Sequence, residues 1–184
     1  MDRVEAIQKL VPIFRRYGYE GATLARISAA TNLGRASLYH HFPKGKKEVA
    51  EAVLEYVGAW FHNQILEPLQ QETDPAKALK IMGDRLNQFY NHGQDACLIA
   101  LFTVGEPDEL FHEEIQQRLK ALISAISTLL QKADLPADIA HKRAEDAVMG
   151  IQGALVLARG LNDNAPFERV IQQLGEKLLA PVGG

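Results

Sequence analysis

Apolar residues recur every three or four positions along almost all of this 184-residue sequence, and this constrains the fold more than any other feature. That spacing places apolar side chains on one face of a helix. No stretch alternates polar and apolar residues in β-branched or aromatic company, as half-buried strands do. The sequence therefore predicts an all-α protein of about nine helices. The clearest run comprises Phe111, Ile115, Leu119, Leu122, Ile126 and Leu129.

Three short helices are expected in the first 42 residues. Gly18 can close the first, and Pro12 should kink it because proline removes a backbone donor. Thr23 is a good N-cap for the second helix, and Asn32 tolerates the positive φ of a short turn after it. The third helix should cover residues 35–42.

A fourth helix over 46–67, ended by Pro68, should connect a small N-terminal domain (1–48) to a helical C-terminal domain (49–184). Asp74 and Pro75 form an N-cap followed by proline, which typically opens a helix. The later apolar segments are expected at 75–92, 97–104, 110–133, 138–161 and 166–180.

The net charge of −3 conceals an uneven distribution. Residues 1–48 hold nine Lys or Arg and four acids, a net charge of +5, which leaves −8 for the rest. Such segregation is typical when one end of a protein meets a polyanion, although a charge run is also found on any solvated face.

Several features indicate a soluble, cytoplasmic protein. The single cysteine, Cys97, cannot form an intramolecular disulfide, which suits a reducing compartment. The N-terminus lacks the apolar run of a signal peptide, and the most apolar window, 147–161, is too short to span a bilayer.

The first three helices have the layout of a helix-turn-helix, with basic residues on and beside the third. Residues 19–28 (YEGATLARIS) and 32–43 (NLGRASLYHHFP) resemble the DNA-binding domain of the TetR family of bacterial repressors. Residues 152–155 and 165–167 are similar to segments of that family's last two helices. The resemblance implies that the third helix enters the major groove and that the C-terminal domain binds a ligand and dimerises.

Residue chemistry assigns roles on this helix-turn-helix. Arg35 can pair with guanine or hold a phosphate, and its small neighbours let the helix lie deep in the groove. Leu38, His41 and Phe42 are expected to pack the core. Because the connection to the fourth helix is one residue longer than the family's commonest one, either Lys46 or Lys47 can contact phosphate, and Lys47 is favoured. The candidate DNA contacts are Thr23, Arg26, Gly34, Arg35, Ala36, Ser37, Tyr39, His40, Lys46 and Lys47.

No motif indicates catalysis, a metal or a cofactor. Adjacent helical residues such as His40 and His41 point about 100° apart and cannot converge on one ion. The sequence contains no P-loop, no G-x-G-x-x-G and no G-x-S-x-G motif. We therefore expect that the protein is not an enzyme.

The helix at 138–161 carries small residues every three or four positions and is apolar on further faces, so we expect one side to join a second subunit. A monomer core is the alternative, but a single half-site would give little specificity. The expected dimer contacts are Ala144, Ala147, Val148, Ile151, Ala154, Ala158, Phe167, Ile171 and Leu174.

The C-terminal domain is rich in large apolar residues with few polar ones, the usual composition of a small-molecule pocket. The same residues would also suit a plain core. Since only Arg159 places a fixed charge on the apolar stretch, we expect an apolar or aromatic, mostly uncharged effector. The candidate ligand contacts are Met82, Phe89, Cys97, Phe102, Phe111, Leu122, Gln152 and Leu155.

The sequence thus favours a homodimeric repressor that binds a palindromic DNA operator and is released when a small effector moves the fourth helix. The alternative is a helical small-molecule-binding protein or enzyme whose helix-turn-helix serves protein contact. That alternative would not need the net charge of +5 on residues 1–48.

Overall fold

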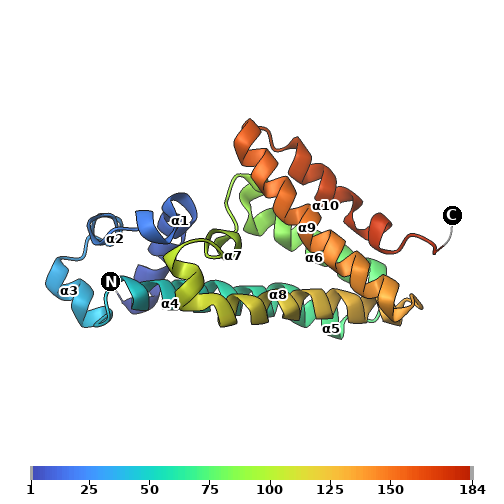
Figure 1. Cartoon of the computed structure of the whole chain (residues 1–184), viewed down its shortest axis with the longest axis horizontal. Helices are drawn as coiled ribbons and strands as arrows, with labels where there is room; N and C mark the ends of the chain where they lie inside the picture. The colour runs from blue at the N-terminus through green and yellow to red at the C-terminus, as the bar shows by residue number, and fades with distance from the viewer. Residues whose placement is uncertain (1, 183–184) are drawn as a thin grey trace. The chain divides into compact units, whose positions relative to one another are not determined.

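The structure is a computed structural model that describes residues 2–182, and all the regular elements in that range are helical (Figure 1). Since α4, η1 and α5 follow one another without a break, the described chain holds nine α-helical segments. The predicted all-α class is confirmed. The elements are α1 (Arg3–Gly21), α2 (Leu24–Thr31), α3 (Arg35–His41), α4 (Lys46–Phe61), the π-helical turn η1 (His62–Leu66), α5 (Glu67–Gln71), α6 (Pro75–Phe89), the 3₁₀ turn η2 (Asn91–Gly93), α7 (Leu98–Leu101), α8 (Glu106–Lys132), α9 (Ala137–Leu161) and α10 (Ala165–Leu178).

These helices group into two compact units. Unit 1 holds the chain up to Trp60 together with Leu98–His112. Unit 2 holds Phe61–Cys97 and the chain from Glu113 onward. The α4–η1–α5 run and α8 are therefore continuous helices that begin in unit 1 and end in unit 2.

The first helix is interrupted at Gly18, whose φ is 65°, and not near Pro12, where the sequence predicts a kink. Pro12 and Gln8, whose carbonyl loses its helical donor to the proline, are both exposed, so water can replace that donor. Gly18 departs from helical geometry because glycine adopts a positive φ at little cost. The tilt of the last turn of α1 is therefore set by glycine.

Local signals in the helix-turn-helix are confirmed. The Thr23 hydroxyl accepts a hydrogen bond from the backbone N–H of Arg26 at 3.3 Å, which caps α2. Asn32 ends α2 in the left-handed region, with a φ of 54°. The third helix then begins at Arg35, as predicted.

The fourth helix does not end at Pro68, as the sequence predicts, but continues to Gln71. One widened turn, η1, precedes the proline, and there the N–H of Glu67 bonds to the carbonyl of His62, five residues back. In this turn the N–H groups bond one residue further back than in an α-helix. The helix can therefore continue past Pro68, which has no N–H to donate.

Four aromatic rings form a cluster in the core of unit 1: Phe14 and Tyr19 on α1, Phe102 directly after α7, and Phe111 on α8. Phe102 is fully buried, with ring centroids 6.1 Å from Phe14, 6.0 Å from Tyr19 and 5.7 Å from Phe111. Burial, and then the negative charge of Glu106, raise the pKa of Tyr19.

In unit 2, α10 packs against both α9 and α6. Figure 1 shows α9 and α10 side by side, in orange and red. The Arg143 guanidinium on α9 donates to the carbonyl oxygens of Leu178 (2.9 Å) and Ala180 (2.5 Å), which fastens the end of α10. The predicted start of α6 is confirmed, because the Asp74 carboxylate accepts from the N–H of Ala76 at 2.9 Å.

Candidate functional site

α3 presents a face of small and polar side chains to solvent. Leu38 and Phe42 point the other way and are buried, which confirms that they pack the core, while His41 is half-buried. No carboxylate occurs on α2 or α3. Because it has no carboxylate, this face can approach a polyanion without charge repulsion. The exposed residues are Gly34, Arg35, Ala36, Ser37, Tyr39 and His40.

Short hydrogen bonds fix the turn that carries α3. The Ser28 hydroxyl donates to the carbonyl of Leu33 at 2.5 Å, and the buried Thr31 hydroxyl donates to the carbonyl of Ile27 at 2.8 Å. The Thr31 hydroxyl also accepts from the backbone N–H of Leu33 at 3.4 Å, so two side chains of α2 bond directly to the turn and stabilise it. Sequence reasoning did not single out Ser28 or Thr31, whose side chains stabilise the turn before α3.

Arg26 is exposed, but two contacts within unit 1 orient its guanidinium. It lies 4.2 Å from the ring centroid of Tyr17 and donates to the carbonyl of Gly21 at 2.7 Å. Arginine has five N–H donors, so others remain for a ligand. Tyr17 therefore belongs to the candidate site, and no sequence motif points to it.

The two candidate lysines at the start of α4 differ in their surroundings. The Lys46 ammonium lies 4.1 Å from the ring centroid of buried Tyr19, a cation–π contact that holds it against the protein. The Lys47 side chain is exposed, with its ammonium 3.9 Å from Glu51 on the next turn. Of the two, Lys47 is the freer to reach a phosphate.

Glu48, the acid nearest to the α3 face in sequence, is occupied by partners. One carboxylate oxygen lies 3.3 Å from the Arg3 guanidinium, and the other accepts from the backbone N–H of Lys44 at 2.9 Å. Its charge is balanced locally. Glu48 therefore adds no unpaired negative charge beside α3.

All nine predicted dimer contacts lie inside unit 2, and none of them is exposed. Ala147 and Ile171 are half-buried, and the others are buried. They contribute to the packing of α9 and α10 within one chain, and their role between subunits stays a prediction. The buried members are Ala144, Val148, Ile151, Ala154, Ala158, Phe167 and Leu174.

α9 carries a different, exposed apolar surface, which we call the α9 stripe: Met149, Gly153, Val156, Leu157, Gly160 and Leu161. Its four large side chains are between 52% and 66% exposed. Their spacing places them on one side of the helix. Small residues dominate the sequence pattern of α9, and for that reason sequence reasoning selected the buried side. An apolar stripe of this kind is typical of a protein contact.

Two descriptions of one family match the sequence. Residues 11–53 match the bacterial regulatory proteins of the tetR family, and residues 75–173 match the C-terminal domain of LmrA/YxaF-like transcriptional regulators. The chain belongs to the TetR family. It is a transcriptional regulator with a DNA-binding helix-turn-helix, and not an enzyme.

Similar proteins extend over nearly the whole chain. The uncharacterized HTH-type regulator YxaF of Bacillus subtilis is 20% identical over 168 residues, which cover 88% of this chain and 87% of YxaF. A TetR regulator from Legionella pneumophila superposes with a TM-score of 0.81 at 18% identity, covering 96% and 97% of the two chains. The TetR regulator CifR, solved with 26-bp operator DNA, gives 0.76 at 21% identity and covers 96% of each chain. These likenesses show a TetR fold.

The predicted ligand contacts of this TetR-family chain fall in both units. Phe102 and Phe111 belong to the aromatic core of unit 1, and the other six lie in unit 2. There the structure brings Cys97 and Gln152 together, with the Gln152 amide donating to the sulfur at 3.4 Å. The Tyr90 hydroxyl, which sequence reasoning missed, donates to the same sulfur at 3.4 Å.

The remaining four predicted ligand contacts divide by burial. Met82 and Leu155 are buried, whereas Phe89 and Leu122 are half-buried. Between residues 2 and 182, no three His, Cys, Asp or Glu side chains gather as a metal site. Within the same range, none of the helices has the length and apolar character needed to cross a membrane.

Proposed function

We propose that the chain is a homodimeric, cytoplasmic repressor that binds a palindromic operator through α3 and is released by a small effector. The exposed face of α3 carries the proposal, because it combines a guanidinium, small side chains and hydrogen-bond donors without a carboxylate. Arg35 can pair bidentately with guanine. Ala36 and Ser37 let the helix lie deep in the groove, and Tyr39 and His40 can donate to phosphates.

The flanks of α3 fix its register on DNA. Thr23 and Arg26 begin α2, where phosphate contacts are common in helix-turn-helix proteins. The exposure of Lys47 and the cation–π contact of Lys46 favour Lys47 as the phosphate contact. Gly34 precedes α3 and lets the DNA backbone approach closely. The operator complex of CifR supports this mode of binding for a protein of the same fold.

Dimerisation places two α3 helices on one operator. The α9 stripe supports this step because it exposes four large apolar side chains beside two glycines, which allow another backbone to approach. A two-fold interface uses the same surface of both subunits, so the stripe can pack on its own copy. The buried small-residue seam then holds α9 and α10 together within each subunit.

In this proposal, residues 1–48 form the DNA-binding domain, and residues 49–184 form the domain that binds the ligand and dimerises. The effector is an apolar or aromatic small molecule in the C-terminal domain, near Cys97 and Gln152, which supply polar groups among apolar neighbours. It must bind the non-DNA state better, and it acts by moving the α4–η1–α5 run, which continues from unit 1 into unit 2.

Arg35→Ala should cost about 1–3 kcal/mol of operator binding and relax preference at one operator position. Lys47→Ala should weaken binding to every sequence alike and lower the slope of log K against log salt by about one. Fluorescence anisotropy with operator and random duplexes at several salt concentrations separates the two. Lys142→Ala, an exposed lysine on α9, is the control that changes neither. Equal effects of Arg35→Ala on operator and random DNA would contradict the base-reading role.

Uncharged aromatic compounds should raise the melting temperature and release the protein from its operator. Gln152→Ala should weaken both responses to the same compound, because it removes the amide that meets Cys97. Thermal shift and operator release measured on one compound series provide the test. A strongly charged effector, or an unchanged response in Gln152→Ala, would show that the effector site lies elsewhere.

A further inference from the structure

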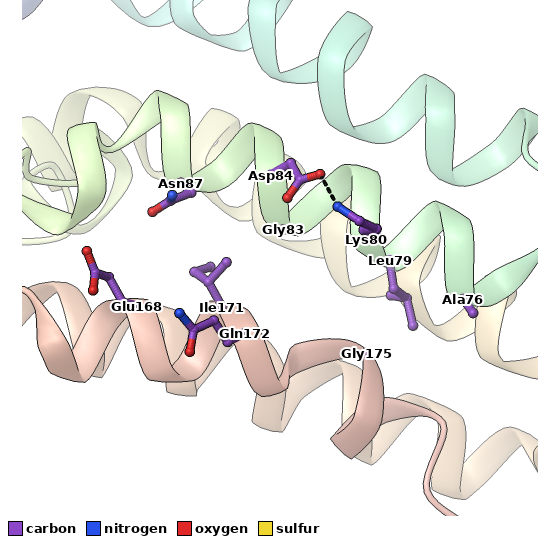
Figure 2. A pocket seen from close by; sticks show the side chains of 10 residues that line it. All are labelled: Ala76, Leu79, Lys80, Gly83, Asp84, Asn87, Glu168, Ile171, Gln172 and Gly175. Atoms are coloured by element: carbon purple, nitrogen blue, oxygen red, sulfur yellow. Dashed lines mark hydrogen bonds and ion pairs between the residues drawn. The ribbon is translucent and has the colours of Figure 1, made fainter.

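We propose that a groove between α6 and α10 binds a small amphipathic primary amine in its protonated form. The groove lies within unit 2 and has a volume of about 560 Å³. Figure 2 shows α6 and α10 as its two walls, with side chains of both helices directed into it. A volume of this size suits a small organic molecule. The proposal concerns a second ligand site and does not depend on operator binding.

Two hydrogen-bond acceptors without partners meet at one end of the groove. The Glu168 carboxylate is exposed to water and has no ion pair or hydrogen bond with any described residue. The carbonyl oxygen of the Asn87 side chain is buried and also lacks a partner within residues 2–182. In Figure 2 the side-chain oxygens of Asn87 and Glu168 face each other across the groove. A group with several N–H donors would satisfy both.

The orientation of the Asn87 amide follows from its other contact. Its nitrogen lies 3.1 Å from Nδ1 of His92, to which it can donate. That bond turns the carbonyl oxygen away from His92. An unmet buried acceptor costs about 1–3 kcal/mol, so a small rotation of the side chain that brings this oxygen to a ligand's N–H group is favourable.

The charges of the groove select a cation. Lys80 and Asp84 form an ion pair at 2.7 Å and neutralise each other. Glu168 then leaves the lining with one net negative charge. A carboxylate ligand would meet Glu168 as a like charge, whereas an ammonium gains a charge-assisted hydrogen bond there. Glu168 lies in the first turn of α10, where the helix dipole favours a carboxylate. The dipole does not explain why the Asn87 side chain faces this carboxylate.

The floor of the groove is apolar and supplies the second half of the recognition. Leu79 and Ile171 line it together with Gly83 and Gly175. A Cβ atom on Gly83 would lie 3.4 Å from the Ile171 side chain, so glycine keeps the two helices close at this point. A hydrocarbon or aryl stem can lie on this floor while its ammonium reaches Glu168 and Asn87.

Calorimetric titration of the full chain with 2-phenylethylamine, 2-phenylethanol and 3-phenylpropanoate at neutral pH tests the proposal. These probes share an aryl stem and differ in charge. We expect the amine to bind at least tenfold more tightly than the alcohol, and the carboxylate to give no measurable binding. Equal affinity for amine and alcohol, tighter binding of the carboxylate, or no binding of the amine would overturn the proposal.

The site is located with a matched pair of variants on α10. Glu168→Gln should weaken the amine at least fivefold and leave the alcohol within twofold, while Glu176→Gln, exposed and outside the groove, should leave both within twofold. In NMR spectra the amine should shift the amide signals of Gly83 and Gly175 but not that of Gly153. Unchanged amine affinity in Glu168→Gln, or shifts confined to other elements, would refute the site whatever the operator experiments show.

Discussion

If the chain dimerises through the α9 stripe as proposed, Leu157→Glu is expected to yield monomers at micromolar concentration and to remove most operator binding. Leu157 lies at the centre of the α9 stripe and is 52% exposed in the single chain. A carboxylate enclosed by an apolar interface costs several kcal/mol. The proposed two-fold interface would contain this carboxylate twice, so dimerisation should weaken by on the order of 100-fold or more.

Sedimentation velocity at micromolar protein measures this change directly. Because Leu157 is exposed in the monomer, helical content and melting of the monomeric variant should show a folded protein. Val104→Glu is the matched control, since it adds the same charge at an exposed apolar residue outside α9, and it should remain dimeric. A wild-type monomer, or a dimeric Leu157→Glu protein, would refute the assigned interface.

Phe102→Ala is expected to lower the free energy of unfolding by about 3–5 kcal/mol, the usual cost of removing a buried aromatic ring. Phe102 is fully buried, and its ring meets those of Phe14, Tyr19 and Phe111. The loss leaves a cavity where α1, α7 and α8 join. For a domain stable by roughly 5–15 kcal/mol, this is a large fraction of the total.

Urea unfolding followed by circular dichroism measures that loss. Val104→Ala, two residues further along and exposed, should stay within about 0.5 kcal/mol of the wild type. A cost below about 1 kcal/mol for Phe102→Ala would mean that the aromatic core contributes little. In that case the ring would be free to serve the effector, as the sequence-based prediction has it.

Local chemistry made much of the fold predictable. Thr23 and Asp74 cap helices because their side chains accept backbone N–H bonds, and Asn32 tolerates a positive φ, so each acts through its immediate neighbours. Leu38 and Phe42 could be assigned to the core because their spacing places both on one face of α3.

Features that depend on distant segments were not predictable. Pro68 seemed to end the fourth helix, since the widened turn before it leaves no mark in the sequence. Leu98–His112 joins unit 1 through contacts of Phe102 with α1, which periodicity cannot show. On α9 both sides are apolar, so which side is exposed depends on where α10 packs. Sequence spacing alone therefore could not separate the buried seam from the exposed α9 stripe.

Selection of duplex DNA from a random pool with the purified chain tests most directly whether α3 reads a two-fold symmetric operator. We expect an enriched inverted repeat whose half-site centres lie about 10 base pairs, or a multiple of that, apart. The Arg35→Ala protein should lose preference at one position in each half-site. Enrichment of no common sequence, or of a single half-site without its repeat, would contradict a dimeric regulator that recognises DNA through α3.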